Sequence, residues 1–259
     1  MPKFSIILTT WNRASILPKT LTSILNQTFA DFELLIMDDG STDNTWNVLT
    51  EFALKDPRIV LSKHDRCRER VISRKELMNE CKGEWIYWVD SDDEIIYGTL
   101  ELLNHAIKTY LDFKVFNFGQ IIFSLTGTDL KVAQELPDWE GEGMNHFDSG
   151  RVGTGGFVFK RECLKDIEPL PEYDNIFDLA DWFGVKVEEW FNKNAPGVEH
   201  QKYNQADKFC GNPWGDDFVF MWLLTRKFKS KKLPINPYIS YIRTENWAYE
   251  FATNSGVMG

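Results

Sequence analysis

The sequence predicts an α/β fold with a mostly parallel central sheet that is flanked by helices. Two observations support this fold class. In the first hundred residues, short continuous apolar runs alternate with segments whose apolar residues recur at helical spacing. Three of the apolar runs also end directly in polar clusters, which is typical of strands whose carboxyl ends form the ligand-binding edge of a doubly wound sheet.

The first two strands and the helix between them have clear patterns. Residues 4–9 form a continuous apolar run, as expected of a strand that is covered on both faces. A helix follows, which Ser15 is suited to cap and in which Pro18 is tolerated because it falls in the first turn. Residues 32–37 form the second strand, which ends in the polar sequence DDGS. An Asp-Gly pair by itself is more typical of a turn than of a binding site.

Two further strands and helices follow in the same alternation. A helix is predicted at residues 43–55 and a short strand at 58–61. Another helix runs through Leu77 and Met78, and residues 85–89 form a fourth strand that leads into the acidic sequence DSDD. We expect the polar ends of the first, second and fourth strands, TTWN, DDGS and DSDD, to meet at one edge of the sheet.

The second half of the chain has a less regular pattern. Strands and helices are predicted, in chain order, at residues 114–123, 157–160, 181–193, 216–229 and 238–242. Residues 137–156 are rich in Gly, Asp and Glu, which is typical of a loop. Because no Pro- or Ser-rich linker interrupts the chain, we expect one domain with two halves, residues 1–112 and 113–259.

Composition and apolar patterning limit the functional classes. Of the 259 residues, 43% are hydrophobic and 26% charged, as in an ordinary globular protein. No apolar run reaches the length of about 18 residues that a membrane-spanning helix needs. The apolar run near the N-terminus is also shorter than the roughly 7–15 residues of a signal peptide. We therefore expect a cytoplasmic protein, with peripheral association with a membrane as the alternative.

Charge and cysteine spacing limit these classes further. The formal charge of −10 argues against non-specific binding to nucleic acid, since that affinity comes from neutralising phosphates. The four cysteines are widely spaced without a Cys-x-x-Cys pair, so we expect reduced thiols and no zinc site. A basic stretch at residues 226–232 has two interpretations: the solvated end of a helix, or a patch that meets an anionic acceptor or a membrane surface.

The DSDD sequence after the fourth strand is the strongest chemical signal. Clustered carboxylates raise one another's pKa, and a divalent cation relieves their repulsion. If the chain turns after Asp90, the side chains of Asp90 and Asp92 can face one ligand, and such oxygen ligands suit Mg²⁺ or Mn²⁺ together with diphosphate oxygens. A calcium-binding EF-hand is excluded because Ile95 stands where that loop needs glycine. An acidic turn that only caps the next helix is the alternative.

The chain resembles the family 2 glycosyltransferases, which have the GT-A fold. The segments that carry the resemblance are FSIILTTWNR, SILNQTFADFELLIMDDGSTDNT and SRKELMNECKGEWIYWVDSDDE, and two looser ones are GTGGFVFKRECL and WGDDFVFMWLL. The resemblance is strong over residues 3–100 and weak beyond them. It implies a Rossmann-like sheet, a nucleotide diphosphate-sugar donor that we expect to be UDP-linked, Mn²⁺ or Mg²⁺ as cofactor, and inversion at the transferred sugar.

The resemblance also implies which residues bind the nucleoside. Thr9 and Trp11 look like the residues that line the base and the ribose, and an aromatic ring at position 11 can stack on a uracil-like base. Asp39 resembles the carboxylate that hydrogen-bonds to the edge of the base, with Asp38 beside it.

Diphosphate and metal contacts are implied further along the chain. Arg74 falls where the family often has an Arg–Asn pair near the diphosphate, but Lys75 replaces that asparagine. Arg70 is a second candidate for the same contact, and surface charge is the alternative interpretation of both arginines. The contacts to ribose, metal and sugar are implied for the acidic run, namely Asp90, Ser91, Asp92 and Asp93.

The catalytic base is implied to lie in the second half. An inverting transferase needs a carboxylate that removes the proton of the acceptor hydroxyl. The family supplies it from an acidic pair at a helix start, and the match here is Asp217, with Asp216 positioning it. A helix cap is the alternative interpretation and is compatible with catalysis. Weaker candidates on the acceptor side are the glycine-rich residues 153–156, Trp214 and, as a third metal ligand, His200.

Several functional questions stay open at the level of the sequence. The acceptor is a glycan, a lipid-linked sugar, a protein or a modified nucleobase. One alternative function is a non-catalytic nucleotide- or carbohydrate-binding protein on the same scaffold, which the intact acidic motifs disfavour. The other is a sugar nucleotidyltransferase, which is disfavoured because the sequence TTWNRAS after the first strand lacks the glycines of a phosphate-binding loop.

Overall fold

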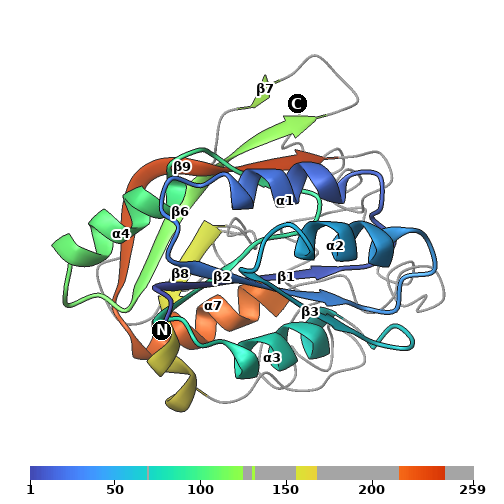
Figure 1. Ribbon diagram of the computed structural model, residues 1–259. Helices are drawn as coiled ribbons and strands as arrows, with labels where there is room; N and C mark the ends of the chain where they lie inside the picture. The colour runs from blue at the N-terminus through green and yellow to red at the C-terminus, as the bar shows by residue number, and fades with distance from the viewer. Residues whose placement is uncertain (69, 125–129, 132–155, 168–215, 243–259) are drawn as a thin grey trace, which may run out of the picture.

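One central sheet with helices on both faces organises the molecule (Figure 1). The computed structural model describes residues 1–68, 70–124, 130–131, 156–167 and 216–242. Within these residues nine strands form the sheet, in the order β3-β2-β1-β4-β8-β6-β9-β5, with β7 paired to β6. The predicted α/β class is confirmed.

The N-terminal half contributes four parallel strands, as predicted. They are β1 (Phe4–Thr10), β2 (Phe32–Asp38), β3 (Ile59–Lys63) and β4 (Trp85–Trp88). β1 lies between β2 and β4, with Thr10 opposite Asp38 and Ile7 opposite Trp88. The carboxyl ends of β2, β1 and β4 therefore lie next to one another at the same edge of the sheet.

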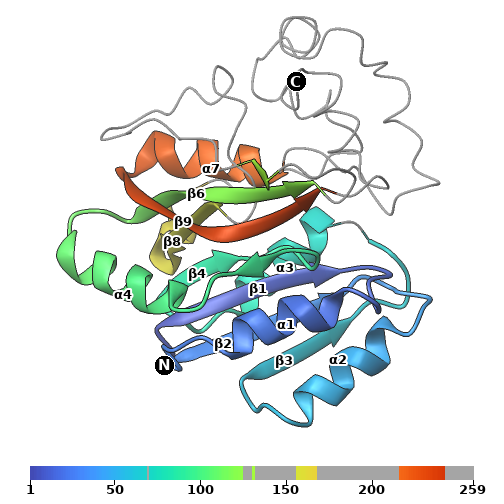
Figure 2. The ribbon, with the colours of Figure 1, turned by 90° about the horizontal axis from the view of Figure 1, so that it is seen from above.

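The later strands extend this sheet beyond β4. β8 (Phe157–Lys160) pairs antiparallel with both β4 and β6 (Val115–Ser124), and β6 pairs parallel with β9 (Ser230–Ile242). β6 and β9 thus run in the same direction as β1 to β4. The short strands β5 (Glu94–Ile95) and β7 (Leu130–Lys131) pair antiparallel with β9 and β6. Figure 2 shows the long β6–β9 pair beside the N-terminal strands, so the two predicted halves share one sheet.

Three helices cover one face of the sheet: α1 (Leu17–Leu25), α2 (Thr45–Ala53) and α4 (Thr99–Thr109). Ile6 and Leu8 of β1 point toward them, because alternate side chains of a strand lie on the same face. They share a buried cluster with Leu21, Leu49 and Leu103 of the three helices. Full burial of an aliphatic side chain of this size stabilises a fold by about 1.5–3 kcal/mol.

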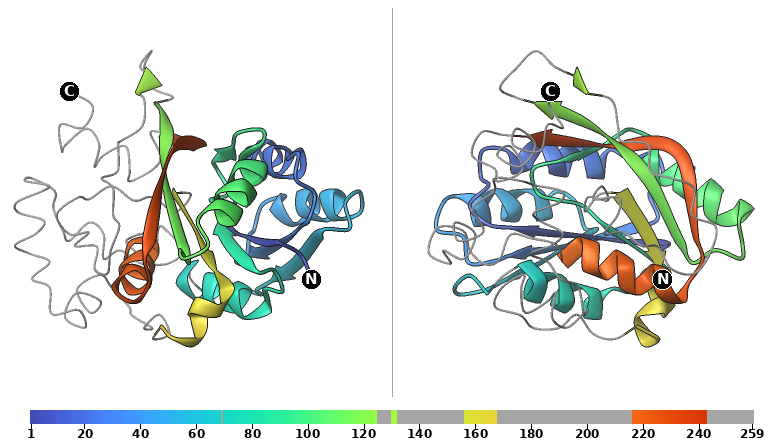
Figure 3. Two further views of the ribbon diagram at one scale, coloured as in Figure 1. Left: turned by 90° about the vertical axis from the view of Figure 1, so that its left-hand side faces the viewer. Right: turned by 180° about the vertical axis from the view of Figure 1, so that it is seen from behind.

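The opposite face is covered by α3 (Arg70–Glu80), the 3₁₀ helix η3 (Arg161–Lys165) and α7 (Asp216–Lys227), as Figure 3 shows. Ile7 and Trp88 belong to this second cluster, together with Leu77 of α3 and Phe220 of α7. The rings of Trp88 and Phe220 are stacked with their centroids 4.6 Å apart. α7 is therefore anchored to the strand that leads into the acidic run.

Two details differ from the sequence-based expectations. α1 begins at Leu17 with Ile16 as its N-cap and has no side-chain capping bond, so the prediction that Ser15 caps it is wrong; Pro18 lies in the first turn, as predicted. β9 is much longer than the strand predicted at 238–242. Its prolines obscured the first half, which pairs with β6 up to a register shift between Phe118 and Gln120.

Part of the second half cannot be compared with the predictions. The helix expected at residues 181–193 and nearly all of the loop at 137–156 lie outside the described residues. None of the helices in the described ranges is both long enough and apolar enough to cross a membrane. The basic stretch spans the end of α7 and the start of β9, where Lys231 Nζ lies 5.2 Å from the ring centroid of Tyr110.

Candidate active site

Three strand ends meet at one edge of the sheet, as predicted. The backbone N–H of Asp39 donates to the carbonyl of Thr10 at 2.9 Å, and the N–H of Val89 donates to the carbonyl of Ile7 at 3.0 Å. These bonds hold the DDGS and DSDD sequences on either side of the end of β1. Trp11 follows β1 directly and is half-buried.

The segment after β1 contacts both neighbouring strand ends. On one side, Asn12 N donates to Ser41 Oγ at 2.9 Å and Asn12 Oδ1 accepts from Thr42 N at 2.8 Å. On the other side, Arg13 Nη2 lies 3.5 Å from Asp92 Oδ2. Asn12 has a φ of 50°, a conformation that Asn adopts more readily than most residues. Sequence reasoning missed Asn12 and Arg13 as site residues, although both lie in the TTWNR segment.

The turn after β2 depends on Asp38 and Gly40. Asp38 is fully buried, and its Oδ1 accepts from Ser41 N at 3.0 Å while its Oδ2 lies 3.8 Å from Lys63 Nζ. Gly40 has a φ of 75°, and a Cβ at this position would lie 2.4 Å from the carbonyl carbon of Arg66. Glycine therefore allows the segment after β3 to approach the DDGS turn.

Asp39 and His64 are both buried and belong to one hydrogen-bond network. Its Oδ1 accepts from Arg68 N at 2.9 Å and lies 2.7 Å from His64 Nδ1. On the other side of the imidazole, His64 Nε2 lies 2.7 Å from Glu76 Oε2, and Arg68 Nη1 donates to Glu76 Oε1 at 2.9 Å. Burial lowers the pKa of His64, but hydrogen bonds and charges from the two carboxylates outweigh burial and raise its pKa above 6.5.

The chain turns directly after β4, which is the condition under which Asp90 and Asp92 can face one ligand. Asp93 N donates to the carbonyl of Asp90 at 3.3 Å, and Thr20 Oγ1 donates to the carbonyl of the buried Ser91 at 3.0 Å. The side chains of Asp90 and Asp92 are 26% and 17% exposed, so both are accessible to a ligand.

Arg74 lies beneath Asp90. Its side chain is only 3% exposed, and Nη2 donates to Asp90 Oδ1 at 2.8 Å. The guanidinium also lies over the ring of Trp88, 4.7 Å from its centroid. The alternative interpretation of Arg74 as surface charge is therefore wrong. Arg70, the second candidate, opens α3 and is half-buried.

Asp93 faces β9. Its Oδ1 accepts from Tyr241 N at 3.0 Å, and its Oδ2 accepts from Ser240 Oγ at 3.2 Å. Burial raises the pKa of Asp93 well above its usual value, and the charges of Asp92 and Asp90 raise it further. The carboxylate thus connects the acidic turn to the C-terminal strand of the sheet.

The candidate catalytic pair lies at the start of α7. Asp216 is the first residue of this helix and Asp217 the second, so the predicted helix start is confirmed, whereas the catalytic role stays a prediction. Trp214, His200 and residues 153–155 lie outside the described residues, and Gly156 is buried before β8.

One cysteine departs from the expectation of reduced thiols. Cys81 and Cys163 are free and buried, and burial raises the pKa of each thiol to about 12. Cys67, in contrast, is disulfide-bonded, so the expectation is wrong for this residue. A disulfide depends on two sulfurs meeting in the fold, which sequence spacing does not reveal. Cys67 Sγ also lies 3.3 Å from Asp39 Oδ2, beside the contact between Asp39 and His64.

A metal would find few protein ligands here. Among the described residues no three His, Cys, Asp or Glu side chains gather as a metal site, so Asp90, Asp92 and Asp93 do not form a three-carboxylate centre. The accessible carboxylates of Asp90 and Asp92 still fit Mg²⁺ or Mn²⁺, because such ions are often held by one or two carboxylates plus substrate phosphates and water.

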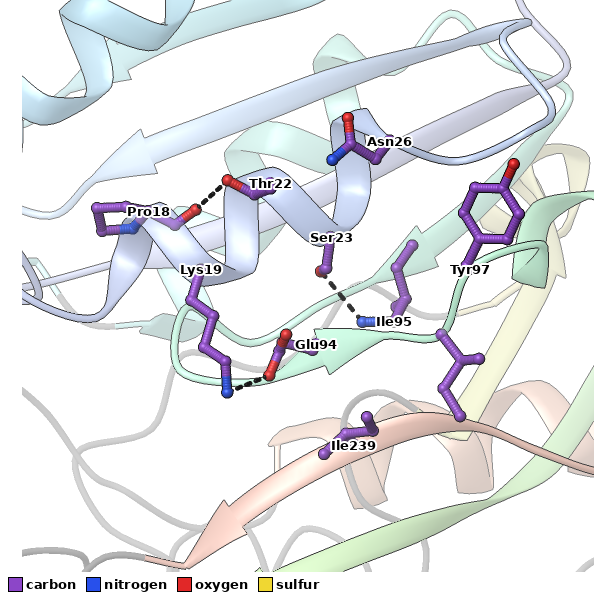
Figure 4. Close-up of a pocket in the computed structure, with 10 residues that line it drawn as sticks. Pro18, Lys19, Thr22, Ser23, Asn26, Glu94, Ile95, Tyr97 and Ile239 are labelled. Atoms are coloured by element: carbon purple, nitrogen blue, oxygen red, sulfur yellow. Dashed lines mark hydrogen bonds and ion pairs between the residues drawn. The ribbon is translucent and has the colours of Figure 1, made fainter.

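A groove of about 680 Å³ lies between α1, β5 and β9 (Figure 4). Polar groups of the protein already pair across it: Lys19 Nζ lies 2.6 Å from Glu94 Oε1, and Ile95 N donates to Ser23 Oγ at 3.2 Å. These contacts hold α1 against the strand that follows the acidic turn.

Comparison with known proteins identifies the family. Residues 5–159, more than half of the chain, match the sequence profile of glycosyl transferase family 2. The chain belongs to this family. A relative from Escherichia coli, the UDP-Glc:alpha-D-GlcNAc-diphosphoundecaprenol beta-1,3-glucosyltransferase WfaP, is 36% identical over 109 residues, which are 42% of this chain and 43% of WfaP. The chain spans less than half the length of the first curated relatives that it matches.

Solved structures share the fold. TarS 1-349 of S. aureus in complex with UDP-GlcNAc has a TM-score of 0.66 at 18% identity, covering 94% of this chain and 60% of that one. Mannosyltransferase PcManGT from Pyrobaculum calidifontis, in complex with GDP-Man and Mn²⁺, has a TM-score of 0.58 at 13% identity, covering 99% of this chain and 64% of that one. The predicted GT-A fold is confirmed.

Proposed function

We propose that this chain is a metal-assisted inverting glycosyltransferase that uses a UDP-linked sugar. The observation that carries the proposal is the meeting of the DDGS and DSDD turns at one edge of the sheet, with Asn12 in contact with the first turn and Arg13 with the second. In doubly wound sheets, ligands bind outside the carboxyl ends of the strands. The UDP-Glc in the name of WfaP and the UDP-GlcNAc bound by TarS support the choice of uridine nucleotides.

The nucleoside is proposed to bind over the ends of β1 and β2. Trp11, directly after β1, offers an aromatic face on which a base can stack, and Thr9 is the next-to-last residue of β1. The Asp39 carboxylate accepts a hydrogen bond from the imide N–H of uracil. Since cytosine has an acceptor at this position, the same carboxylate would disfavour a cytidine nucleotide.

The diphosphate and the metal are proposed to lie at the acidic turn. Asp92 and Asp90 would hold Mn²⁺ or Mg²⁺, which supplies charge neutralisation for the departing diphosphate. Arg74 positions Asp90 through their 2.8 Å contact. Arg13 and Arg70 are the cations proposed to meet the phosphate oxygens, because Arg74 is buried beneath Asp90.

Transfer is proposed to occur in one displacement. The acceptor hydroxyl oxygen attacks the anomeric carbon, the bond from that carbon to the diphosphate oxygen breaks, and the configuration inverts. Asp217 takes the hydroxyl proton as the general base, with Asp216 positioning it. UDP leaves with the bonding electrons.

The acceptor class that we propose is a sugar linked to a lipid diphosphate. The support is the name of WfaP, whose acceptor is an undecaprenol diphosphate-linked sugar. Protein, free glycan and modified nucleobase remain as the alternative acceptors.

A transfer assay tests the proposal. Purified protein, Mn²⁺ and UDP-glucose or UDP-GlcNAc are incubated with GlcNAc-diphosphoundecaprenol, and the lipid product and released UDP are quantified. We expect stoichiometric transfer and UDP release, both lost in Asp217→Asn, which should still bind UDP. Binding of UDP without transfer to any acceptor of the four classes would favour a binding protein. Turnover by Asp217→Asn at the wild-type rate would refute the assigned base.

A further inference from the structure

The histidine between Asp39 and Glu76 has no role in the function proposed above. His64 directly follows β3, and its backbone N–H donates to the carbonyl of Asp38 at 2.9 Å, so its position is fixed relative to the end of β2. Its residue is only 8% exposed. The imidazole therefore stands in the wall of the proposed base site rather than on the surface.

Both nitrogens of this imidazole face carboxylate oxygens. Nδ1 lies 2.7 Å from Asp39 Oδ1, and Nε2 lies 2.7 Å from Glu76 Oε2. A neutral imidazole carries one N–H and one lone pair, so it can donate to only one of the two carboxylates. Only the imidazolium donates to both, and its positive charge compensates the negative charges on either side.

The remaining charges around His64 complete a closed ring. Arg68 donates from its backbone N–H to Asp39 Oδ1 and from Nη1 to Glu76 Oε1, so it joins the same two carboxylates as His64. Lys63 precedes His64, and its Nζ lies 3.8 Å from Oδ2 of Asp38, the residue before Asp39. The charged side chains of this ring are thus the carboxylates of Asp39, after β2, and Glu76, in α3, and the guanidinium of Arg68, which contacts Glu76.

We propose that His64 is a positioning residue for donor recognition, which acts as an imidazolium held by Glu76 and fixes the Asp39 carboxylate for contact with the nucleobase. This inference rests on the proposed role of Asp39 in binding the base. Two donors on the single oxygen Oδ1, His64 Nδ1 and Arg68 N, set the plane of the Asp39 carboxylate. When His64 loses its proton, it can no longer donate to both carboxylates at once, and this constraint is weakened.

The consequence is a pH dependence of uridine nucleotide affinity. The pKa of His64 is raised above 6.5, so the imidazolium is present at acidic pH and is lost as the pH rises through this raised pKa. UDP affinity should fall over the same interval. Replacing Glu76 by Gln removes one of the two carboxylates that raise the pKa, so the interval should move to lower pH.

The test compares UDP dissociation constants of wild type, His64→Gln and Glu76→Gln from about pH 5.5 to 9 in the presence of Mn²⁺, measured by calorimetry. The ratio of two constants at each pH cancels the titration of the diphosphate itself. We expect His64→Gln to bind UDP about tenfold more weakly at the acid end, and the ratio to approach one at the alkaline end. Glu76→Gln should shift the midpoint of the wild-type transition downward. The matched control is His105→Gln, an exposed histidine on α4.

A purely structural role predicts a different pattern. In that case His64→Gln would lower the unfolding temperature while its UDP affinity kept the wild-type pH dependence, which would overturn the inference. An unchanged midpoint in Glu76→Gln would overturn it as well. If wild type binds no UDP at any pH, the proposed function fails and this inference fails with it. If wild type binds UDP and His64→Gln binds it with the same affinity at every pH, this inference is wrong while the proposed function stands.

Discussion

Arg74 Nη2 lies 2.8 Å from Asp90 Oδ1, under the first carboxylate of the acidic turn. The guanidinium is nearly buried and lies over the face of Trp88, the last residue of β4. A buried cation and a partly exposed carboxylate thus connect α3 to the strand end that carries the proposed metal ligands. This contact makes Arg74 part of the scaffold of the site.

Replacing Arg74 by Met should therefore reduce stability as well as binding. The variant leaves Asp90 without its cation, and we expect a loss of about 2 kcal/mol in the free energy of unfolding, below the range for fully buried pairs because Asp90 is partly exposed. Urea unfolding measures it. Arg13→Met, which removes a longer and more exposed contact, serves as the control and should stay within about 0.5 kcal/mol of wild type. Equal unfolding free energies of Arg74→Met and Arg13→Met would contradict the structural role of Arg74.

The Asp93→Asn variant should show that the last carboxylate of the acidic turn is not a metal ligand. The amide keeps an oxygen for Tyr241 N and removes a buried charge that lies near Asp92 and Asp90. In metal-free buffer we expect the unfolding temperature to be unchanged or about 2–4 °C higher. In a domain of this size, a rise of that amount corresponds to a gain of up to about 1 kcal/mol in the free energy of unfolding. Mn²⁺-dependent UDP binding should persist. Loss of that binding would instead place Asp93 among the metal ligands.

Gly40→Ala should disturb the base side of the site. A methyl group there meets the backbone of Arg66 at 2.4 Å, and the φ of 75° is unfavourable for alanine. We expect a destabilisation of about 1–3 kcal/mol, and weaker UDP binding because Arg68 N is displaced from Asp39. Gly98→Ala is a matched control, since Gly98 also has a positive φ but has open space around its Cβ position. The difference in unfolding temperature between the two variants measures the effect of the close contact with Arg66, separate from that of the positive φ.

His64 should also make folding stability depend on pH. Because its pKa is raised in the folded state, its contribution is fully present below the unfolded value of 6.5 and is lost as the pH rises through the folded value. The difference in unfolding free energy between wild type and His64→Gln should therefore be larger at about pH 6 than at about pH 9. A difference that grows with pH would have the wrong sign for an imidazolium between carboxylates.

The sequence predicted the frame of the site well. Continuous apolar runs mark β1, β2 and β4 because both of their faces are buried, and the polar clusters that follow mark the ligand edge. The same patterns located Asp39, Asp90 and Asp92, since parallel strands must end at one edge.

The residues that hold these side chains in place were harder to predict. Glu76 and His64 come together only because α3 and the end of β3 approach the DDGS turn, which no local pattern records. The burial of Arg74 likewise depends on tertiary packing against Trp88, whereas a lone arginine in a polar helix indicates surface charge.

The most direct test of the proposed site is calorimetric titration of wild type and Asp92→Ala with UDP, each with Mn²⁺ and again with EDTA. The account predicts that wild type binds UDP, that EDTA weakens this binding by at least about tenfold, and that Asp92→Ala binds weakly under both conditions while remaining folded. Equal affinity of wild type and Asp92→Ala in Mn²⁺, or UDP binding that is indifferent to EDTA, would contradict it.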